Sequence, residues 1–289
     1  MEVSTILYSL CYFIAALILL FIARFIYDLA TPYAIRDQLT TNSSTAVGIV
    51  LAGYLGGFIS VIAGVFTGGP APEPPSVFRF IHELPSVLLY ASMGMAALVI
   101  AGWVNDKFIL HRFSITRELI DHSNIGVANV LAGSFVGSGL IIAGGISGSF
   151  SAASFGLAFV LGQVGLVAFS MVYRRLTKHD EMGQLSKYKN SAVGIAWSGN
   201  LVAYSLILST GLARMNPFGT ESLLNQMQIF SFYALSGIIL LPLARELVDR
   251  FFIPGMRLRD QIVGQQNVGV GLIKATLAIS VAIMIVWSF

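Results

Sequence analysis

Long apolar stretches separated by short polar segments repeat along the whole chain of 289 residues. A helix that spans the hydrocarbon core of a bilayer needs roughly 20 mostly apolar residues. The apolar runs are continuous, as from Ile14 to Ile22, and lack the alternation of a membrane β-barrel. The pattern therefore predicts an all-α, polytopic membrane protein with eight transmembrane helices, at residues 4–30, 44–66, 86–104, 124–146, 152–173, 190–212, 228–248 and 267–287.

A short signature opens every second predicted span and groups the eight helices into four helical hairpins. It reads Asn or Ser, any residue, a small residue, Val and a second small residue, and it begins at Ser44, Asn124, Asn190 and Asn267. The side-chain oxygen of Asn or Ser can accept a hydrogen bond from a free backbone N–H at the start of a helix. The signature therefore indicates an internal repeat of like-oriented hairpins, each with a capped second helix.

The same four spans carry two small residues, four positions apart, at a fixed distance from the cap. Small residues at this spacing let helix backbones approach closely in lipid. We therefore expect these spans to form the packed interior and the other four to face more lipid. The expected helix-packing residues are Gly53, Gly57, Gly133, Gly137 and Gly199, and the pattern is completed by Ala203, Thr276 and Ser280.

The spacing between copies divides the chain into two halves. The first copy aligns with the third at 146 residues, and the second aligns with the fourth at 143 residues. Residues 1–147 and 148–289 are therefore predicted to be two tandem four-helix membrane repeats. Each unit has an even number of spans, so the copies share one orientation and their pseudo-symmetry axes run along the membrane normal.

Positive charge is concentrated on one side of the predicted membrane protein. Of the 17 Lys and Arg residues, fourteen lie at the elbows that join the two helices of a hairpin, two (Arg79 and Arg214) lie at the other connections, and Lys274 lies inside a span. Lys and Arg in short loops mark the cytoplasmic side. We therefore expect cytoplasmic elbows and both termini on the periplasmic or exterior side. The net charge of +3 then reflects topology and indicates no nucleic-acid partner.

The tandem four-helix units, the Asn-x-small-Val-small helix start and charged elbows such as Arg36-Asp37 and Arg259-Asp260 resemble the YjfL-like family of bacterial inner-membrane proteins. That family contains a domain of unknown function often found in two copies. The resemblance covers nearly the whole chain and rests on packing motifs. It implies a multi-pass location in the bacterial inner (plasma) membrane and carries over no functional residue. This chain departs from the pattern at Arg174, which replaces an acidic residue, and at Lys274.

Residues suited to catalysis or metal binding are not grouped in the sequence. The four histidines, His82, His111, His122 and His179, are scattered over three connections and form no metal-binding helix motif. Cys11 is the single cysteine, which excludes a thiolate cluster within one chain. The sequence therefore predicts no enzyme, no metal site and no cofactor.

Polar residues within predicted spans are costly in lipid and by default raise a functional-site hypothesis. Asn129, Gln163, Asn200 and Lys274 are of this kind. The two asparagines can also simply bridge neighbouring helices. Lys274 lies about 10 Å from the start of its helix at 1.5 Å per residue, from where a lysine can extend toward the membrane surface.

The sequence leaves two kinds of function open. The first is a channel-like pathway for a small solute or ion, lined by Asn129, Asn200 and Lys274, with Lys274 favouring an anion. The alternative is a membrane-embedded scaffold or envelope-stress partner whose elbows recruit cytoplasmic proteins, and an enzyme ranks third. The lipid bilayer is the expected surrounding, while a homo-oligomer and a cytoplasmic protein partner are both left open.

The connection at residues 68–85 contains five prolines around an apolar run at residues 77–84. Because proline disrupts a helix interior, this run is predicted to be a connector at the membrane surface. A lid over an exterior vestibule is the alternative.

Overall fold

The computed structural model of the chain describes residues 3–68, 74–148, 151–177, 179–215, 222–251 and 258–289, and the regular structure in these ranges is helical. Eight helices are long and apolar enough to cross a membrane. They are α1 (Val3–Ala30), α3 (Thr45–Thr67), α4 (Val77–Val104, continued by the π-helical turn η1, Asn105–Ile109), α6 (Ile125–Gly148), α7 (Ala152–Leu176), α9 (Ser191–Ala213), α10 (Leu223–Phe251) and α12 (Val268–Ser288). The predicted all-α polytopic fold is confirmed.

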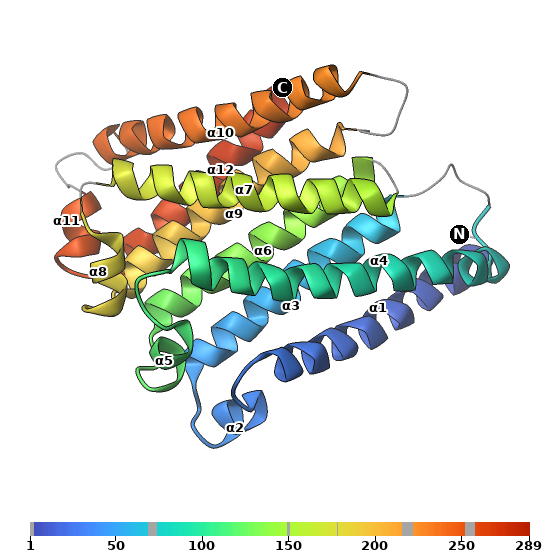
Figure 1. Cartoon of the computed structure of the whole chain (residues 1–289), viewed down its shortest axis with the longest axis horizontal. Helices are drawn as coiled ribbons and strands as arrows, with labels where there is room; N and C mark the ends of the chain where they lie inside the picture. The colour runs from blue at the N-terminus through green and yellow to red at the C-terminus, as the bar shows by residue number, and fades with distance from the viewer. Residues whose placement is uncertain (1–2, 69–73, 149–150, 178, 216–221, 252–257) are drawn as a thin grey trace.

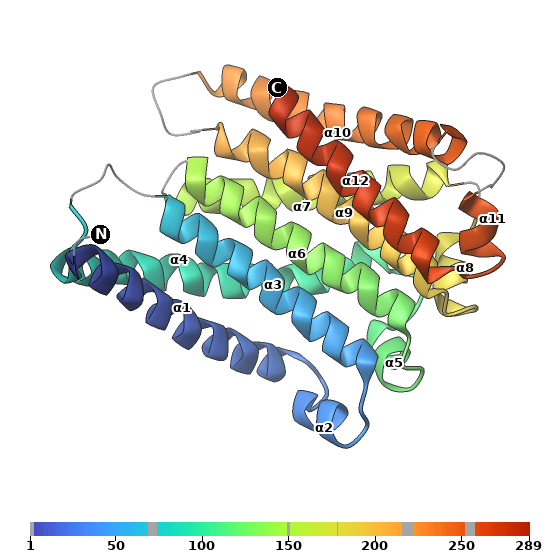
Figure 2. The same ribbon diagram turned by 180° about the vertical axis from the view of Figure 1, so that it is seen from behind.

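The long helices form two layers. One layer is the row α3–α6–α9–α12, in which α3 packs against α6, α6 against α9, and α9 against α12 (Figure 2). The second layer, formed by α4, α7 and α10, covers one face of this row. The helix α1 lies beside α3 and α4 at the α3 end of the row (Figure 1). The inner helices α6 and α9 are the most buried of the eight, as expected from the repeat. At the end of the row, α12 is more exposed than α4 and α7, because it has a row neighbour on one side only.

Glycines allow very close contacts between neighbouring helices of the row. A Cβ atom added to Gly53 would lie 2.3 Å from the Cα atom of Ala132, and one added to Gly199 would lie 2.4 Å from the Cα atom of Ala275. Similar distances occur at the other three predicted packing glycines: 2.4 Å to the carbonyl oxygen of Phe135 for Gly57, 2.8 Å to the Cα atom of Ser198 for Gly133, and 2.3 Å to the Oγ atom of Ser205 for Gly137. A similar close contact of glycine with the next helix, which we call the packing step of the row, therefore joins α3 to α6, α6 to α9 and α9 to α12.

Each hairpin turns through a six-residue helix that the apolar pattern did not predict. These elbow helices are α2 (Ile35–Thr40), α5 (Ile115–Ile120), α8 (Glu181–Ser186) and α11 (Leu258–Val263). A residue with left-handed backbone then precedes each cap, with φ of 49° at Ser43, 46° at Ser123, 50° at Lys189 and 52° at Gln266. The cap side chains of Ser44, Asn124, Asn190 and Asn267 accept the N–H of the Val three residues later. The signature is therefore a helix cap in all four copies.

The cap amides also connect neighbouring elbows. The Nδ2 atom of Asn124 donates to the carbonyl oxygen of Leu185 in α8 at 2.7 Å, and that of Asn190 donates to the carbonyl oxygen of Ile262 in α11 at 2.8 Å. Leu185 and Ile262 each lie five residues before the cap of their own unit. The same type of hydrogen bond therefore holds one elbow to the next.

The apolar run at residues 77–84 forms the start of α4, which continues through Pro85, so the prediction of a connector or lid there was wrong. A proline in a helix interior removes a backbone donor, but this turn is supported by side chains. The Nε atom of Arg79 donates to Glu83 at 2.8 Å, and the hydroxyl of Tyr8 in α1 donates to Glu83 at 2.9 Å. Residues 69–73 of the connection lie outside the described residues.

Candidate functional site

A cavity of about 730 Å³ lies at the elbow end of the second half, between α7, α9, α10 and α11. Its lining includes three residues that are also exposed on the outer surface of the helices: Leu176, Ile239 and Leu243. Asn200 lies in its wall, ten residues beyond the cap of α9 and therefore about 15 Å deep at 1.5 Å per residue. This length along α9 is about half of the roughly 30 Å thickness of a hydrocarbon core.

Two of the three residues predicted to line a pathway meet at the inner end of this cavity. Asn200 and Lys274 both line an adjoining cavity of about 30 Å³, which shares Tyr173, Asn200 and Arg245 with the larger one. Lys274 is only 8% exposed, so its side chain lies within the protein and not on the lipid-facing surface. The lysine in the fourth repeat therefore belongs to an internal polar site.

Two arginines and one lysine, from three different elements, surround this site. Arg245 comes from α10, Arg259 from α11 and Lys274 from α12, and together they line a third small cavity with His179 and Glu181. The guanidinium carbon of Arg245 lies 5.2 Å from the ring centre of Tyr173, a favourable cation–π distance. The described lining, which includes Glu246, therefore has three cations, two carboxylates and one histidine.

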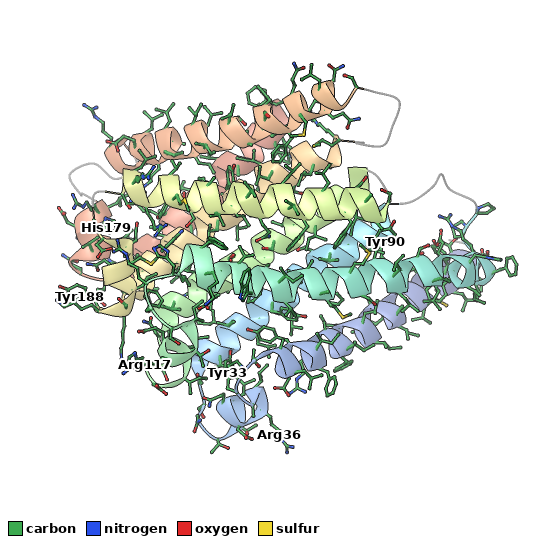
Figure 3. The ribbon with its side chains drawn as sticks, in the orientation of Figure 1. Tyr33, Arg36, Tyr90, Arg117, His179 and Tyr188 are labelled. Atoms are coloured by element: carbon green, nitrogen blue, oxygen red, sulfur yellow. The ribbon has the colours of Figure 1, made fainter. Side chains whose placement is uncertain are left out.

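His179 and Glu181 form the wall of the site at its elbow end. The Nε2 atom of His179 lies 3.2 Å from Glu181 Oε1, and Glu181 is 3% exposed. Glu181 Oε2 has no hydrogen-bond partner among the described residues. Figure 3 shows His179 at the elbow end of the molecule, on the same side as Arg117 and Tyr188. The site can therefore offer both donors and an acceptor to a polar solute entering from the elbow side.

Aromatic rings fill the equivalent space in the first half. Tyr54 stacks on Tyr27 with ring centres 4.3 Å apart, and Phe135 packs edge-on against Tyr54 at 5.6 Å. At the repeat spacings of 146 and 143 residues, Tyr54 corresponds to Asn200 and Phe135 corresponds to Ala278. Smaller side chains at these two positions account for the space in the second half.

The cations are also specific to the second half. Arg245 corresponds to Gly102, and Lys274 corresponds to Leu131. Arg245 was absent from the residues predicted to line a pathway, although a comparison of the two halves at these spacings would have found it. Arg259 belongs to the charged elbow motif, and nothing in the sequence placed it beside Lys274.

The remaining polar residues of the spans lie elsewhere. Asn129 is half-buried in α6, in the first half, and its Nδ2 atom donates to the carbonyl oxygen of Ile125 in the same helix at 2.8 Å. The Nε2 atom of Gln163 in α7 donates to the Oγ atom of Ser138 in α6 at 2.9 Å, and so bridges two helices. Among the described residues, no three His, Cys, Asp or Glu side chains are grouped as metal ligands.

Comparison with known proteins gives matches along the whole chain. The family model described as domain of unknown function DUF350 matches residues 1–146 and 147–289, with a third, overlapping match at residues 79–164. The UPF0719 inner membrane protein YjfL of Escherichia coli strain K12 is 28% identical over 128 residues, which are 44% of this chain and 86% of that protein. The protein of the same name from Escherichia coli O157:H7 matches with the same values. No solved structure shows a significant match.

Proposed function

The chain belongs to the DUF350 family and is a multi-pass inner-membrane protein, and on this premise we propose that its second half binds a small anion as part of a channel-like pathway. One observation carries the proposal. Lys274, buried in the spanning region, shares an internal site with Arg245, Arg259 and Asn200. Solute binding, and not chemistry on the solute, is the role that this lining suits.

The physical argument concerns the cost of a charged residue inside a membrane helix. A lysine at a helix centre costs roughly 2.5 to 3.5 kcal/mol on insertion scales, and the equivalent residues of the other copies are Leu51, Leu131 and Trp197. Packing of the row therefore does not require a lysine. A pocket lined by several cations within low-dielectric walls raises the local concentration of anions, which gives Lys274 a function.

In this proposal the elbows face the cytoplasm, as the distribution of Lys and Arg indicates, and the anion enters the cavity from that side. The cavity ends near the middle of the bilayer, so passage to the other side needs a second conformation. We assign that movement to α10, because Pro242 lies inside this helix and in the cavity wall, and proline is a common site of helix bending.

A scaffold that recruits cytoplasmic proteins is the second candidate function. The observation that favours it is the close glycine packing of the row, in which Gly53, Gly133 and Gly199 leave no space between neighbouring helices. Such packing suits a rigid support. In this case the elbows would recognise the partner, and the cavity would be incidental.

The test compares Lys274→Met with Lys107→Met in purified protein reconstituted into liposomes. Lys107 also lies on the elbow side, but its side chain is 57% exposed and does not line the cavity. We expect Lys274→Met to lower the uptake of chloride or inorganic phosphate at least several-fold, and Lys107→Met to leave it near the wild-type rate.

Thermal unfolding of each variant identifies a loss of flux that comes from misfolding. Unchanged flux in Lys274→Met, together with equal or greater stability, would contradict the anion proposal and favour the scaffold. If Lys274 has no role in flux, methionine at this position only removes the cost of burying a charge.

A further inference from the structure

The row α3–α6–α9–α12 ends on each side in a face that resembles an internal interface of the row. At the α12 end, Thr276 is exposed. Counted from the helix cap, Thr276 is equivalent to Gly133 in α6 and Gly199 in α9, where an added Cβ atom would meet Ser198 of α9 and Ala275 of α12. The position that contacts the next helix of the row in α6 and α9 is thus exposed in α12.

The hydrogen bonds between elbows also indicate an unfilled interface at each end of the row. The cap amides of Asn124 and Asn190 donate to the carbonyl of the next elbow, whereas Asn267 in the last copy is exposed, and its amide lies 3.4 Å from Gln261 of its own elbow. At the other end of the row, the carbonyl equivalent to those of Leu185 and Ile262 belongs to Leu39. The last copy therefore presents the donor, and the first copy presents the matching acceptor.

Two glycines at the ends of the row complete the pattern. Within the chain, a Cβ atom on Gly194 would lie 2.2 Å from the carbonyl oxygen of Gly126, so the fifth residue of one signature meets the third residue of the preceding one. Gly48 is the fifth residue of the first signature, and its only near neighbour is Leu39 Cδ2 at 3.6 Å. Gly269 is the third residue of the last signature and is near only Asn267 Oδ1, at 3.3 Å. No close approach among the described residues requires glycine at either position.

We propose that α12 of one copy docks on α3 of a second copy by the packing step that joins the helices within the row. Asn267 would then donate to the Leu39 carbonyl of the second copy, and Gly48 of that copy would lie against Gly269. The step from α6 to α9 already joins the two matches to the family model, so one family domain docks on another through this face. All hairpins share one orientation, so a second copy in the same membrane is correctly oriented for this contact.

The occupant is a second copy of this chain because both halves of the contact are present in one sequence. The Escherichia coli relative is about half as long as this chain, since 128 residues are 86% of it and 44% of this chain. The fold is therefore built from units that can be added along the row. The contact goes beyond the proposed anion site, because Thr276 lies about 200° around α12 from Lys274 at 3.6 residues per turn.

One substitution distinguishes this contact from the internal ones. Thr276 takes the place of Gly53, Gly133 and Gly199, so the two helices must lie farther apart than within the chain. At the internal step, a Cβ atom on Gly199 would lie 2.4 Å from the Cβ atom of Ala275. The equivalent pair between copies is Thr276 and Ala52, and both are exposed.

Disulfide formation between these two positions is the test. In a Cys11→Ser background, one tagged protein carries Thr276→Cys and a second, with a different tag, carries Ala52→Cys, and both are reconstituted in the same bilayer and oxidised. We expect a cross-linked species that contains both tags, because Cβ atoms about 3.5 to 4.5 Å apart form a disulfide readily. Thr276→Cys mixed with Val164→Cys, which is exposed on α7 in the other layer, should not cross-link.

Two variants keep the test independent of folding. Gly48→Leu should abolish the cross-link but leave the thermal stability of the monomer unchanged, whereas Gly156→Leu, at a position with no atom within 4 Å, should leave both unchanged. Thr276→Gly should strengthen the association of the chain without added cysteines. The proposal is overturned if no mixed species forms, if Thr276→Cys alone cross-links as in a two-fold dimer, or if Gly48→Leu retains the cross-link.

Discussion

The contribution of close glycine packing to stability can be measured by comparing two adjacent glycines of α3. A Cβ atom on Gly57 would lie 2.4 Å from the carbonyl oxygen of Phe135, whereas one on Gly56 would lie 3.4 Å from the Cγ2 atom of Val136, an ordinary contact. Gly57→Ala therefore forces a shift between α3 and α6, and Gly56→Ala fills existing space. Both variants make the same Gly→Ala change at adjacent positions of one helix, so the effect of helix propensity cancels in the comparison.

The magnitude follows from the size of the forced shift. The Gly57 contact must open from 2.4 Å to at least 3.0 Å, below which real Cβ contacts are essentially never found. A radial gap of about 0.5 to 1 Å forfeits a quarter to a half of the dispersion energy of the affected atom pairs. An added methyl or methylene group in a well-packed interior costs about 1 to 3 kcal/mol. We therefore expect Gly57→Ala to be less stable than Gly56→Ala by about 1 to 3 kcal/mol.

Thermal unfolding of the purified proteins in the same detergent measures this difference. At about 2 to 4 °C per kcal/mol, the Tm of Gly57→Ala should lie below that of Gly56→Ala by about 2 to 12 °C. The same Tm for both variants would show that the backbones of α3 and α6 are not held at this close distance. Glycine packing would then not be what holds the row together.

Two further predictions concern topology and the elbows. A reporter that is active only in the cytoplasm should be active when fused after Lys189 and inactive when fused after Phe289, and the opposite result would reverse the proposed orientation. Asn190→Ala should lower stability by more than the roughly 1 kcal/mol typical of a lost helix cap, because it also removes the bond to the Ile262 carbonyl. Asn267→Ala in the detergent-solubilised monomer, which loses the cap but no bond to a next elbow, is the matched control, and equal losses in Tm would contradict a role for the elbow bond.

The sequence predicted those features that depend on local pattern. The cap at Asn190 and the close contact at Gly199 could be predicted, because each depends on a residue type at a fixed position in a repeated helix. The elbow helix α8 could not, since six residues carry no usable apolar period and this element is held by the bond from Asn124 to Leu185. The helical turn before Pro85 is supported by a hydrogen bond from Tyr8 of α1, which is distant in sequence.

The candidate site was predicted only in part, for a related reason. Asn200 and Lys274 stood out because polar residues are unusual in apolar spans. Arg245 lies near the charged end of α10 and looks like an ordinary topology signal until the fold places it beside Lys274. Asn129 was selected by the same rule as Asn200, but it lies in the other half, where aromatic rings fill the corresponding space.

The order of helices in the row has a consequence for how the protein is made. Each row helix packs against the one synthesised before it, so every new hairpin finds its docking face already in the membrane when it leaves the ribosome. Because each repeat contacts mainly its neighbours, assembly can proceed stepwise from the first hairpin and does not need the C-terminal end of the chain. The number of hairpins in the chain is then the number that assemble in a fixed order before the protein meets another molecule.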